Sequence, residues 1–242
     1  MAKNASASVS LTDREGRNNP VGRVAVVEHA YSALKQKILN NEFPPGYQAL
    51  EQEVADMLGV SRTPVREILT RLQDEGLIER LPRRGFRVLP LTPRDIRELA
   101  DVLSCLEVRA IELLTEQNLA PDAEPLRVLE AANDHARQAL SSDDREGWAD
   151  ADREFHRAIL HFCGNPHLTH TGFAVWDQFH RADMITLRIR PMPENSPLEH
   201  DEIMAAIRAH DVKDAAERLA RHRRNGRETI IASLEKFGLR HL

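Results

Sequence analysis

The sequence of 242 residues has only two cysteines and no long apolar run. Cys105 and Cys163 are too few for a disulfide framework or for a four-cysteine zinc site. No apolar stretch approaches the ~18 residues that a membrane span requires, and the polar start MAKNASASVS lacks the apolar middle of a secretory signal. We therefore expect a soluble, cytoplasmic protein that has no membrane partner.

The sequence also lacks the short motifs of several common enzyme classes. It contains no HExxH zinc-binding motif, no P-loop for nucleotide phosphates and no GxSxG nucleophile turn. The catalytic residues that these motifs would supply are therefore missing, and we expect a protein that is not an enzyme.

Positive charge is in slight deficit, with 33 basic and 38 acidic residues and a formal net charge of −5. An acidic total argues at first against nucleic acid as a partner. The segments differ, however: residues 1–23 have a charge of +2, residues 24–90 are neutral, and residues 91–242 have a charge of −7. Within the neutral segment, residues 61–90 contain seven arginines and four acidic residues. This local excess of arginine makes nucleic acid a candidate partner again.

Residues 24–90 have the pattern of three helices and a hairpin. Apolar residues at helical spacing predict helices over about residues 27–40, 50–58 and 61–76. Short apolar runs on either side of the turn Pro82-Arg83-Arg84-Gly85 predict a hairpin. A basic third helix and a basic hairpin tip are typical of a winged helix-turn-helix DNA-binding domain. Residues 1–23 show no periodicity, so we expect a flexible N-terminal arm there.

The third helix and the hairpin tip contain the candidate DNA contacts. Arg62 and Arg66 are four residues apart, so they share a helix face distinct from the apolar one. An arginine side chain donates two hydrogen bonds to guanine O6 and N7. Thr63 at the helix start is placed for a phosphate, and the tip adds Arg84 and Gly85, which allows close approach of its backbone. The alternative for each single arginine is an ordinary solvated surface position.

From residue 91 onward the pattern is helical, with no strand pattern and no internal repeat. Thr92 and Pro93 predict the start of a long helix that extends to about Gln117. Five more helices are predicted over residues 122–141, 146–163, 167–190, 197–210 and 212–237. Six such helices predict an antiparallel bundle with an internal cavity over residues 91–242, so the fold class is mainly α.

Four side chains of this half form a candidate metal site. Asp152 and His156 are four residues apart on one helix face, and a carboxylate and an imidazole at this spacing chelate a single ion. His200 and His222 lie on otherwise apolar stripes, where a buried imidazole needs a polar partner. One aspartate and three histidines suit zinc, nickel or another divalent ion.

The spacing alone leaves other interpretations open. A histidine on an apolar face is commonly a hydrogen-bonded core residue. Asp152 and His156 by themselves are also compatible with a plain surface ion pair. His210 shares the stripe of His200 and is a rival ligand.

Arg109 is the other informative residue of the helical half. It lies on a stripe that also contains Leu99, Val102, Leu106 and Leu113, so we expect it to point into the bundle. A buried guanidinium group needs an anion. That anion is either an internal carboxylate, such as Glu107, or the carboxylate of a bound ligand.

The segment LGVSRTPVREILTRLQDEGLIERLPRRGFRV closely resembles the signature of GntR-family transcriptional regulators. The PPG turn, the SRTPVRE motif and the GL…RG wing have the spacing of that family over residues 27–90. The resemblance implies that Arg62, Thr63, Arg66 and Gly85 contact operator DNA. Gln52 departs from the pattern, because several relatives have a further DNA-contacting arginine at that position.

The helical half resembles the FCD effector domain of the FadR-type branch of that family. The matching segments are DVLSCLEVRAIELL, DADREFHRAIL, EHDEIMAAIRAHDVKDA and RHRRNGR, and six helices resemble the shorter VanR-type version. In family members with a metal, an aspartate and three histidines hold it, and these fall on Asp152, His156, His200 and His222. A carboxylate ligand between the metal and Arg109 resembles what FCD regulators do with small organic acids.

Together these features predict a ligand-responsive transcriptional regulator, by default a repressor. We expect a homodimer that binds a near-palindromic operator, with one winged helix on each half-site. A small carboxylate bound at the metal site is expected to shift the arrangement of the dimer and so its operator affinity. The alternatives are a regulator in which the ion itself is the signal, and a metal-dependent hydrolase.

Overall fold

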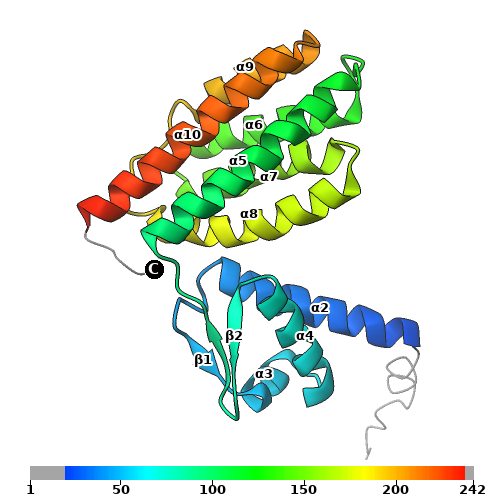
Figure 1. Ribbon diagram of the computed structural model, residues 1–242, viewed down its shortest axis with the longest axis vertical. Coiled ribbons are helices and arrows are strands. Elements are labelled where there is room, and N and C mark those ends of the chain that lie inside the picture. The colour runs from blue at the N-terminus through cyan, green and yellow to red at the C-terminus, as the bar shows by residue number, and fades with distance from the viewer. Residues whose placement is uncertain (1–19, 238–242) are drawn as a thin grey trace, which may run out of the picture.

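The computed structural model describes residues 20–237, which form a small winged-helix unit and a bundle of helices (Figure 1). The mainly helical fold predicted from the sequence is confirmed. Residues 1–19 of the predicted arm lie outside the described residues, as do residues 238–242. The first described helix begins at Pro20, earlier than the predicted start near Val27, and so includes the end of the predicted arm.

Three helices and three short strands form the winged-helix unit. The helices are α2 Pro20–Leu39, α3 Glu51–Leu58 and α4 Arg62–Asp74. The strands are β1 Gln48–Ala49, β2 Ile78–Leu81 and β3 Gly85–Val88, in the antiparallel order β1-β3-β2. The predicted hairpin is therefore present, and β1 is an addition to it. The sequence pattern does not predict β1, because two residues are too few to show an alternation.

One apolar core holds this unit together. Leu34 and Ile38 of α2 share a buried cluster with Ile68 and Leu72 of α4 and with Phe86 of β3. Burial of each such side chain stabilises the fold by about 1.5–3 kcal/mol. Because the buried residues of α4 occupy one face, the arginines at its start lie on the opposite, exposed face.

Gly85 allows strand β1 to approach the start of β3, next to the tip of the wing. Its φ angle is +79°, in the left-handed region that favours glycine. A Cβ atom at this position would lie 1.9 Å from the carbonyl oxygen of Ala49. The glycine is therefore required by the packing of the sheet itself, apart from any role at DNA.

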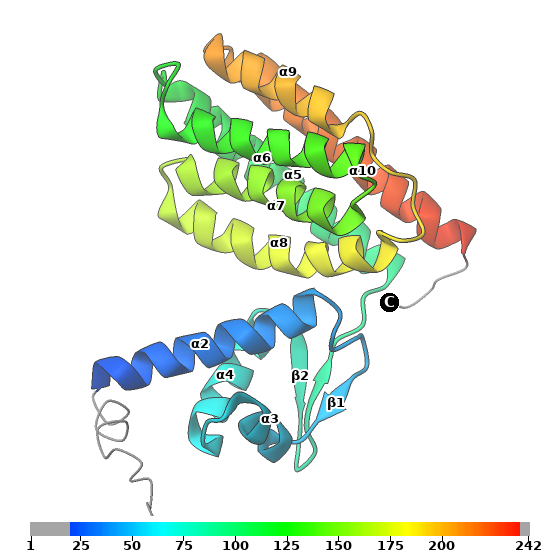
Figure 2. The same ribbon diagram turned by 180° about the vertical axis from the view of Figure 1, so that it is seen from behind.

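Six helices form the bundle, as the sequence predicts (Figures 1 and 2). They are α5 Pro93–Glu116, α6 Glu124–Ser141, α7 Arg145–Phe162, α8 Pro166–Thr186, α9 Ser196–Arg208 and α10 Val212–Lys236. Thr92 caps α5, because its side-chain oxygen accepts a hydrogen bond from the Asp95 amide. Among residues 20–237, no helix is both long and apolar enough to cross a membrane.

The expectation that Arg109 points into the bundle is wrong. Its side chain is 50% exposed and pairs with Glu112 and Glu116 of the same helix. The buried stripe of α5 is instead formed by Ile96, Ala100, Leu103, Glu107, Ala110, Ile111 and Leu114. The two stripes are one residue apart, about 100° around the helix, and both are rich in apolar residues. Packing against neighbouring helices, rather than the pattern along α5, decides which of them is buried.

Helix α8 is the part of the bundle that lies against the winged-helix unit, next to α2 (Figure 2). Lys35 Nζ of α2 is 2.7 Å from Asp177 Oδ2 of α8 and 2.8 Å from Glu75 Oε2 at the end of α4. Gln178 Nε2 donates a 2.8 Å hydrogen bond to the backbone carbonyl of Glu75. One helix of the bundle therefore contacts the end of the helix that begins with the candidate DNA-binding arginines.

A second contact of α8 fixes the chain between the two units. Arg181 is fully buried and donates a hydrogen bond to the backbone carbonyl of Leu89, just after β3. Burial lowers the pKa of Arg181 to about 10, so the guanidinium is still charged at neutral pH. Leu91, two residues later, belongs to the apolar core of the bundle. The connection is therefore short and held at both ends.

Candidate functional site

The arginines at the start of α4 form an exposed basic surface around one carboxylate. Arg62, Thr63 and Arg66 are all exposed. Glu51 Oε2, at the start of α3, lies 2.9 Å from Arg66 Nε and 3.4 Å from Arg62 Nη2. The hydrogen bond from Arg66 lowers the pKa of Glu51, which keeps this carboxylate ionised. Glu51 therefore holds two guanidinium groups of neighbouring turns in one orientation.

Arg80 of β2 extends this surface, and sequence reasoning missed it. Its Nη2 lies 3.3 Å from Glu51 Oε1, and its Nη1 lies 3.3 Å from Thr70 Oγ1 of α4. A hollow of about 690 Å³ is lined by Arg62 and Arg66 of α4, by Arg80 and by Arg83 of the hairpin tip. No linear spacing reveals this grouping, because its members come from α3, α4 and β2.

The remaining predicted DNA contacts lie at the hairpin tip. Arg84 is exposed in the turn between β2 and β3. Gly85 follows it and is partly exposed. Gln52, which departs from the family pattern, donates a 2.8 Å hydrogen bond to Asp56 on its own helix. The five predicted contacts thus lie on two elements, the first turns of α4 and the tip of the wing.

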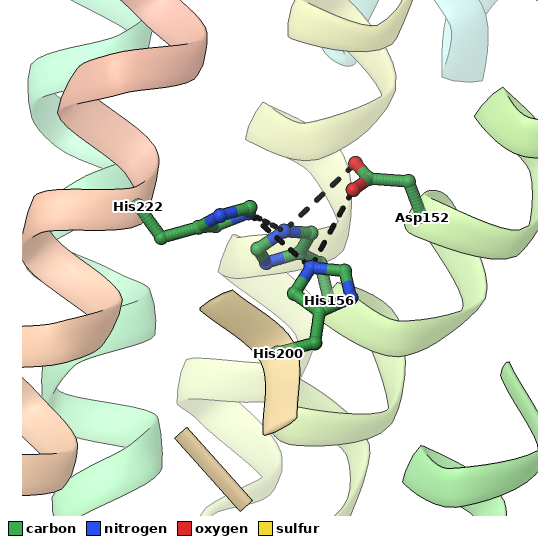
Figure 3. Close-up of side chains that lie close together, drawn as sticks. All are labelled: Asp152, His156, His200 and His222. Carbon is green, nitrogen blue, oxygen red and sulfur yellow. Dashed lines mark hydrogen bonds and ion pairs between the residues drawn. The ribbon is translucent and has the colours of Figure 1, made fainter. Parts of the chain in front are cut away.

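The four predicted metal ligands come together inside the bundle (Figure 3). Asp152 and His156 are on α7, His200 is on α9 and His222 is on α10. One candidate ligand atom from each residue lies within 4.8 Å of all the others, and all four residues are buried. His222 Nε2 is 3.1 Å from His156 Nε2 and 3.3 Å from His200 Nε2. We call these four residues the Asp/His cluster.

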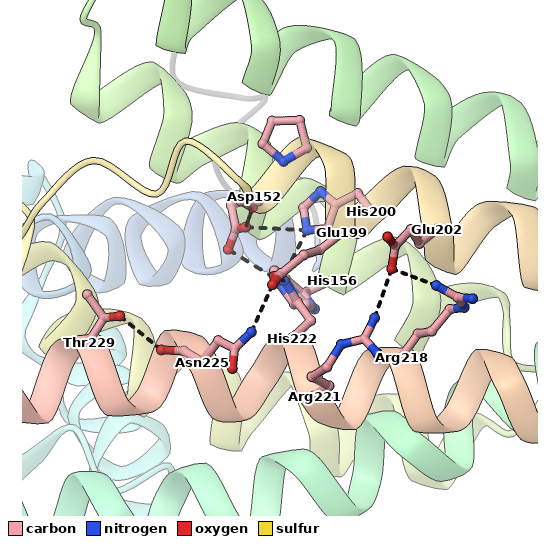
Figure 4. Close-up of polar contacts among 12 residues, drawn as sticks. Asp152, His156, Glu199, His200, Glu202, Arg218, Arg221, His222, Asn225 and Thr229 are labelled. Carbon is pink, nitrogen blue, oxygen red and sulfur yellow. Dashed lines mark hydrogen bonds and ion pairs between the residues drawn. The ribbon is translucent and has the colours of Figure 1, made fainter.

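Two of the imidazoles are oriented by oxygen atoms at their other nitrogen. His200 Nδ1 lies 3.1 Å from Asn133 Oδ1. His222 Nδ1 lies 2.6 Å from Glu199 Oε2, and Glu199 also accepts a 2.8 Å hydrogen bond from Asn225 (Figure 4). Because an oxygen acceptor at Nδ1 places the proton there, the Nε2 atom of each ring is left with a lone pair.

The third imidazole faces Glu107, a functional residue that the sequence interpretation placed with the wrong partner. Glu107 Oε1 is 3.4 Å from His156 Nδ1 and accepts a 3.1 Å hydrogen bond from Trp176 Nε1 of α8. Its Oε2 is 2.6 Å from Arg223 Nε. Burial alone would raise the pKa of this carboxyl, but Arg223 and the imidazoles of His156 and His222 together outweigh it and lower the pKa. The sequence feature that could have identified Glu107 is its position as a carboxylate on an apolar stripe of α5.

The cluster fits a divalent metal ion. His222 Nε2 faces the Nε2 atoms of His156 and His200 across 3.1 and 3.3 Å, and lone pairs facing one another at such distances repel unless a cation lies between them. Burial lowers the pKa of His156 and lowers that of His200 further, which favours the neutral, metal-binding form of these two imidazoles. Asp152 adds a carboxylate oxygen 3.6 Å from His200 Nε2. Three nitrogens and one oxygen suit zinc or nickel.

Two other histidines of the helical half lie apart from the cluster. His210, the rival ligand, is exposed beyond the end of α9, with a φ angle of +57°. His180 of α8 is buried, but neither of its nitrogens has a hydrogen-bond partner among the described residues. The Asp/His cluster is therefore formed by the four residues that the resemblance implied.

A cavity of about 690 Å³ lies beside the cluster, and Asp152 and His222 are part of its wall. Ser196, Glu199, Trp148 and Arg190 also line the cavity. This volume lies within the ~300–1,000 Å³ of typical small-molecule sites. A ligand in the cavity would therefore have direct access to two members of the cluster.

Comparison with known proteins supports both halves of this description. Residues 26–88 match the gntR family of bacterial regulatory proteins, and residues 98–225 match the FCD domain. The chain is 40% identical to an HTH-type transcriptional regulator encoded in the TAR-I ttuE–ttuC′ intergenic region of Agrobacterium vitis. That similarity extends over 151 residues, which are 62% of this chain and 86% of the relative.

Solved structures share the fold. E. coli McbR/YncC superimposes with a TM-score of 0.75 at 24% identity, covering 88% of this chain and 98% of that chain. The metal-free FCD domain of TM0439 gives a TM-score of 0.50 at 23% identity, covering 60% of this chain and 98% of that domain. The relatives are transcriptional regulators and not enzymes. The chain belongs to the GntR family of bacterial regulatory proteins and consists of a helix-turn-helix unit followed by an FCD domain.

Proposed function

We propose that this regulator is a homodimer that binds a near-palindromic operator and releases it when a small carboxylate enters the FCD domain. By default it acts as a repressor in the cytoplasm. The observation that carries the proposal is the convergence of three imidazole lone pairs and Asp152 at the wall of a cavity. Such a cluster supports a metal-assisted ligand site.

The DNA contacts of the proposal come from α4 and the wing. Arg62 and Arg66 donate to base edges in the major groove, and Thr63 donates to a phosphate. Arg84 and the backbone at Gly85 meet the phosphates or the minor groove beside the wing. The contacts of Glu51 with Arg62 and Arg66 support this role, because side chains held in place lose less entropy on binding.

The effector site of the proposal lies at the Asp/His cluster. Asp152, His156, His200 and His222 would hold a divalent ion, zinc or nickel, which supplies a Lewis acid for a carboxylate oxygen. Asp152 and His222 line the cavity, so a ligand there reaches the ion. Arg109 has no part in this site, because its side chain lies on the outer face of α5.

Contacts through α8 supply a route from the cluster to the DNA-binding unit. Glu107 contacts both His156 and Trp176 of α8. The next residue, Asp177, pairs with Lys35 of α2, which also pairs with Glu75 at the end of α4. A ligand that moves the side chains of the cluster would thus shift α8. This shift would change the spacing of the two α4 helices in the dimer.

A second candidate is a regulator that responds to the ion itself. The contacts from His156 through Glu107 to Trp176 favour it, because they connect a ligand residue to α8 without any organic molecule. In that case the metal alone changes operator affinity.

Operator binding by the full chain separates these candidates. The operator is first selected from a random pool of duplexes and then titrated with metal-stripped protein, reloaded protein, and reloaded protein with a library of organic acids. We expect metal alone to leave affinity unchanged and one class of acids to weaken it at least about tenfold. Release by metal alone would favour the second candidate, and hydrolysis of an acid would contradict both.

Two variants test the separate roles of the two domains. Arg66→Ala should cost about 1–3 kcal/mol of operator affinity and leave the metal content unchanged. His222→Ala should retain operator binding but lose stoichiometric metal and the response to acid. Matched controls are Arg188→Ala and His161→Ala, which replace exposed residues of the bundle. Operator affinity of Arg66→Ala equal to that of the wild type in a gel-shift titration would refute the role of Arg66. A full response of His222→Ala to acid would refute the role of His222.

A further inference from the structure

The cavity beside the Asp/His cluster contains a second set of polar atoms that lack partners. Trp148 of α7 and Arg190, which follows α8, both line the cavity and are 4% and 6% exposed. Trp148 Nε1 and the Nε and Nη2 atoms of Arg190 have no hydrogen-bond partner within residues 20–237. Buried donors without an acceptor are costly, so this position requires an acceptor.

The unpartnered Nε and Nη2 atoms of Arg190 form the edge of the guanidinium group that can donate two hydrogen bonds to a carboxylate. Nε and Nη2 present two parallel N–H groups that match the two oxygens of a carboxylate. The remaining nitrogen, Nη1, donates a 2.6 Å hydrogen bond to Asp183 Oδ1 of α8. Asp183 therefore fixes the orientation of the group and leaves the Nε and Nη2 donors of this edge without a partner.

Neighbouring residues hold this edge rigidly in place. The Arg190 guanidinium carbon is 5.1 Å from the centroid of the Trp148 ring. Arg145 Nη1 donates 2.9 Å hydrogen bonds to the backbone carbonyls of Leu187 and Arg190, which fixes the turn that follows α8. A donor edge organised before binding loses little entropy when a ligand arrives.

Two other arginines that line the cavity already have acidic partners. Arg223 Nε is 2.6 Å from Glu107 Oε2, and Arg227 Nη1 pairs with Asp101. Arg190 differs from both in its burial, because its unpartnered Nε and Nη2 atoms belong to a side chain that is only 5% exposed. Arg224 also lines the cavity, but it is exposed. Among the residues that line the cavity, buried donors without a partner therefore occur at Arg190 and Trp148.

We propose that Arg190 and Trp148 bind the second acidic group of the effector, which makes the effector a small dicarboxylate. The inference rests on the proposed effector site, since one carboxylate lies at the Asp/His cluster and the other at Arg190, in the same cavity. A monocarboxylate leaves the Arg190 edge unpaired. A site built to satisfy a polar group discriminates strongly against an analogue that lacks it.

Calorimetric titration of the metal-loaded full chain with pairs of acids of equal chain length tests the proposal. The pairs are succinate and butyrate, glutarate and valerate, and adipate and hexanoate. We expect the best diacid to bind at least about tenfold more tightly than its monoacid. Arg190→Gln should remove this preference while monoacid affinity and metal content stay unchanged. Arg188→Gln, at an exposed position two residues away, should keep the preference.

If Arg190→Gln does not fold, Trp148→Phe is a second variant, and it leaves the Arg190–Asp183 pair intact. It removes the Nε1 donor, keeps a smaller aromatic ring at this position, and should weaken diacid binding several-fold without changing monoacid binding. Equal binding of diacids and monoacids to the wild type, or an unchanged preference in the folded variants, overturns the dicarboxylate assignment but not the carboxylate site. Failure of every acid in both series to bind overturns the two together.

Discussion

Gly46 and Gly85 both adopt left-handed backbone conformations in the winged-helix unit, with φ angles of +80° and +79°. Their surroundings differ. A Cβ atom at Gly46 would meet no other atom within 4 Å, whereas one at Gly85 would lie 1.9 Å from the Ala49 carbonyl oxygen. Alanine substitutions at the two positions therefore distinguish two contributions to the loss of stability, backbone strain alone at Gly46 and strain with a steric clash at Gly85.

Gly85→Ala should destabilise the winged-helix unit much more than Gly46→Ala does. We expect Gly46→Ala to cost about 1–2 kcal/mol of unfolding free energy, since an L-residue is strained in this conformation. Gly85→Ala should cost roughly 3 kcal/mol or more, because the clash adds to that strain and disrupts the pairing of β1 with β3. Urea denaturation of both variants measures the difference. Equal costs would show that β1 moves away freely.

Side-chain chemistry at single positions predicted the Asp/His cluster from the sequence, but not its supporting residues. His200 and His222 stand out, because imidazoles are unusual on apolar stripes, and the family resemblance supplied their partners. Glu107 was hidden, because two overlapping apolar stripes on α5 differ by one residue and the pattern favoured the one with Arg109. Linear spacing also does not show that Arg80 of β2 lies beside Glu51 of α3.

At the scale of elements, α8 contacts both the neighbourhood of the cluster and the DNA-binding unit. Trp176 contacts Glu107 on one side of the helix, and Asp177 pairs with Lys35 and Arg157 on another. Burial alone would lower the pKa of Lys35, but Asp177 and Glu75 outweigh it and raise the pKa. The lysine is therefore firmly charged, and the interface depends on its acidic partners.

Asp177→Asn should loosen the docking of the two units. The variant leaves Lys35 with one acidic partner and the half-buried Arg157 with none among its described contacts, at a cost of about 1–3 kcal/mol. We expect thermal unfolding, followed by circular dichroism, to split into two transitions. Glu98→Gln, which breaks an exposed pair with Arg94, should change stability by less than about 0.5 kcal/mol. A single transition at the wild-type midpoint would show that the Asp177 pair does not hold the units together.

The helices themselves followed from the sequence to within a few residues, apart from the early start of α2. Caps and breakers mark their ends, such as Thr92 before α5 and Asn165-Pro166 at the start of α8. The packing of α8 against α2 did not follow from the sequence. The packing depends on Lys35, Asp177 and Gln178. In the linear sequence these are ordinary polar residues, and their specific contacts form only when the two units pack together.

At the scale of the whole molecule, the metal should couple the stability of the FCD domain to pH. Burial lowers the pKa of His156 and His200 below the ~6.5 of an unfolded histidine. Their neutral forms therefore stabilise the fold fully above about pH 6.5, and this contribution is lost as pH falls toward the lowered folded values. Protons also compete with the metal for the same nitrogens.

Metal-stripped protein should accordingly melt at a lower temperature than reloaded protein. The difference between the two melting temperatures should decrease as the pH falls. A free ion at 100 times its Kd stabilises the fold by about 2.7 kcal/mol. Thermal melts of both forms from about pH 7.5 to 5 test this, with His161→Ala as the control for an exposed histidine. A difference that stays constant over this range would contradict a histidine-bound ion.

The contact between Arg181 and the Leu89 carbonyl has a consequence for exchanging sensors between regulators of this kind. A hybrid made by joining residues 20–91 to a foreign helical domain would keep the apolar core of the winged-helix unit. It would lose the guanidinium that fixes the end of β3 and the side chains that meet Lys35 and Glu75. Such a hybrid would bind DNA without responding to its new sensor. Transplanting Asp177, Gln178 and Arg181 into the foreign helix should therefore be part of any working chimera.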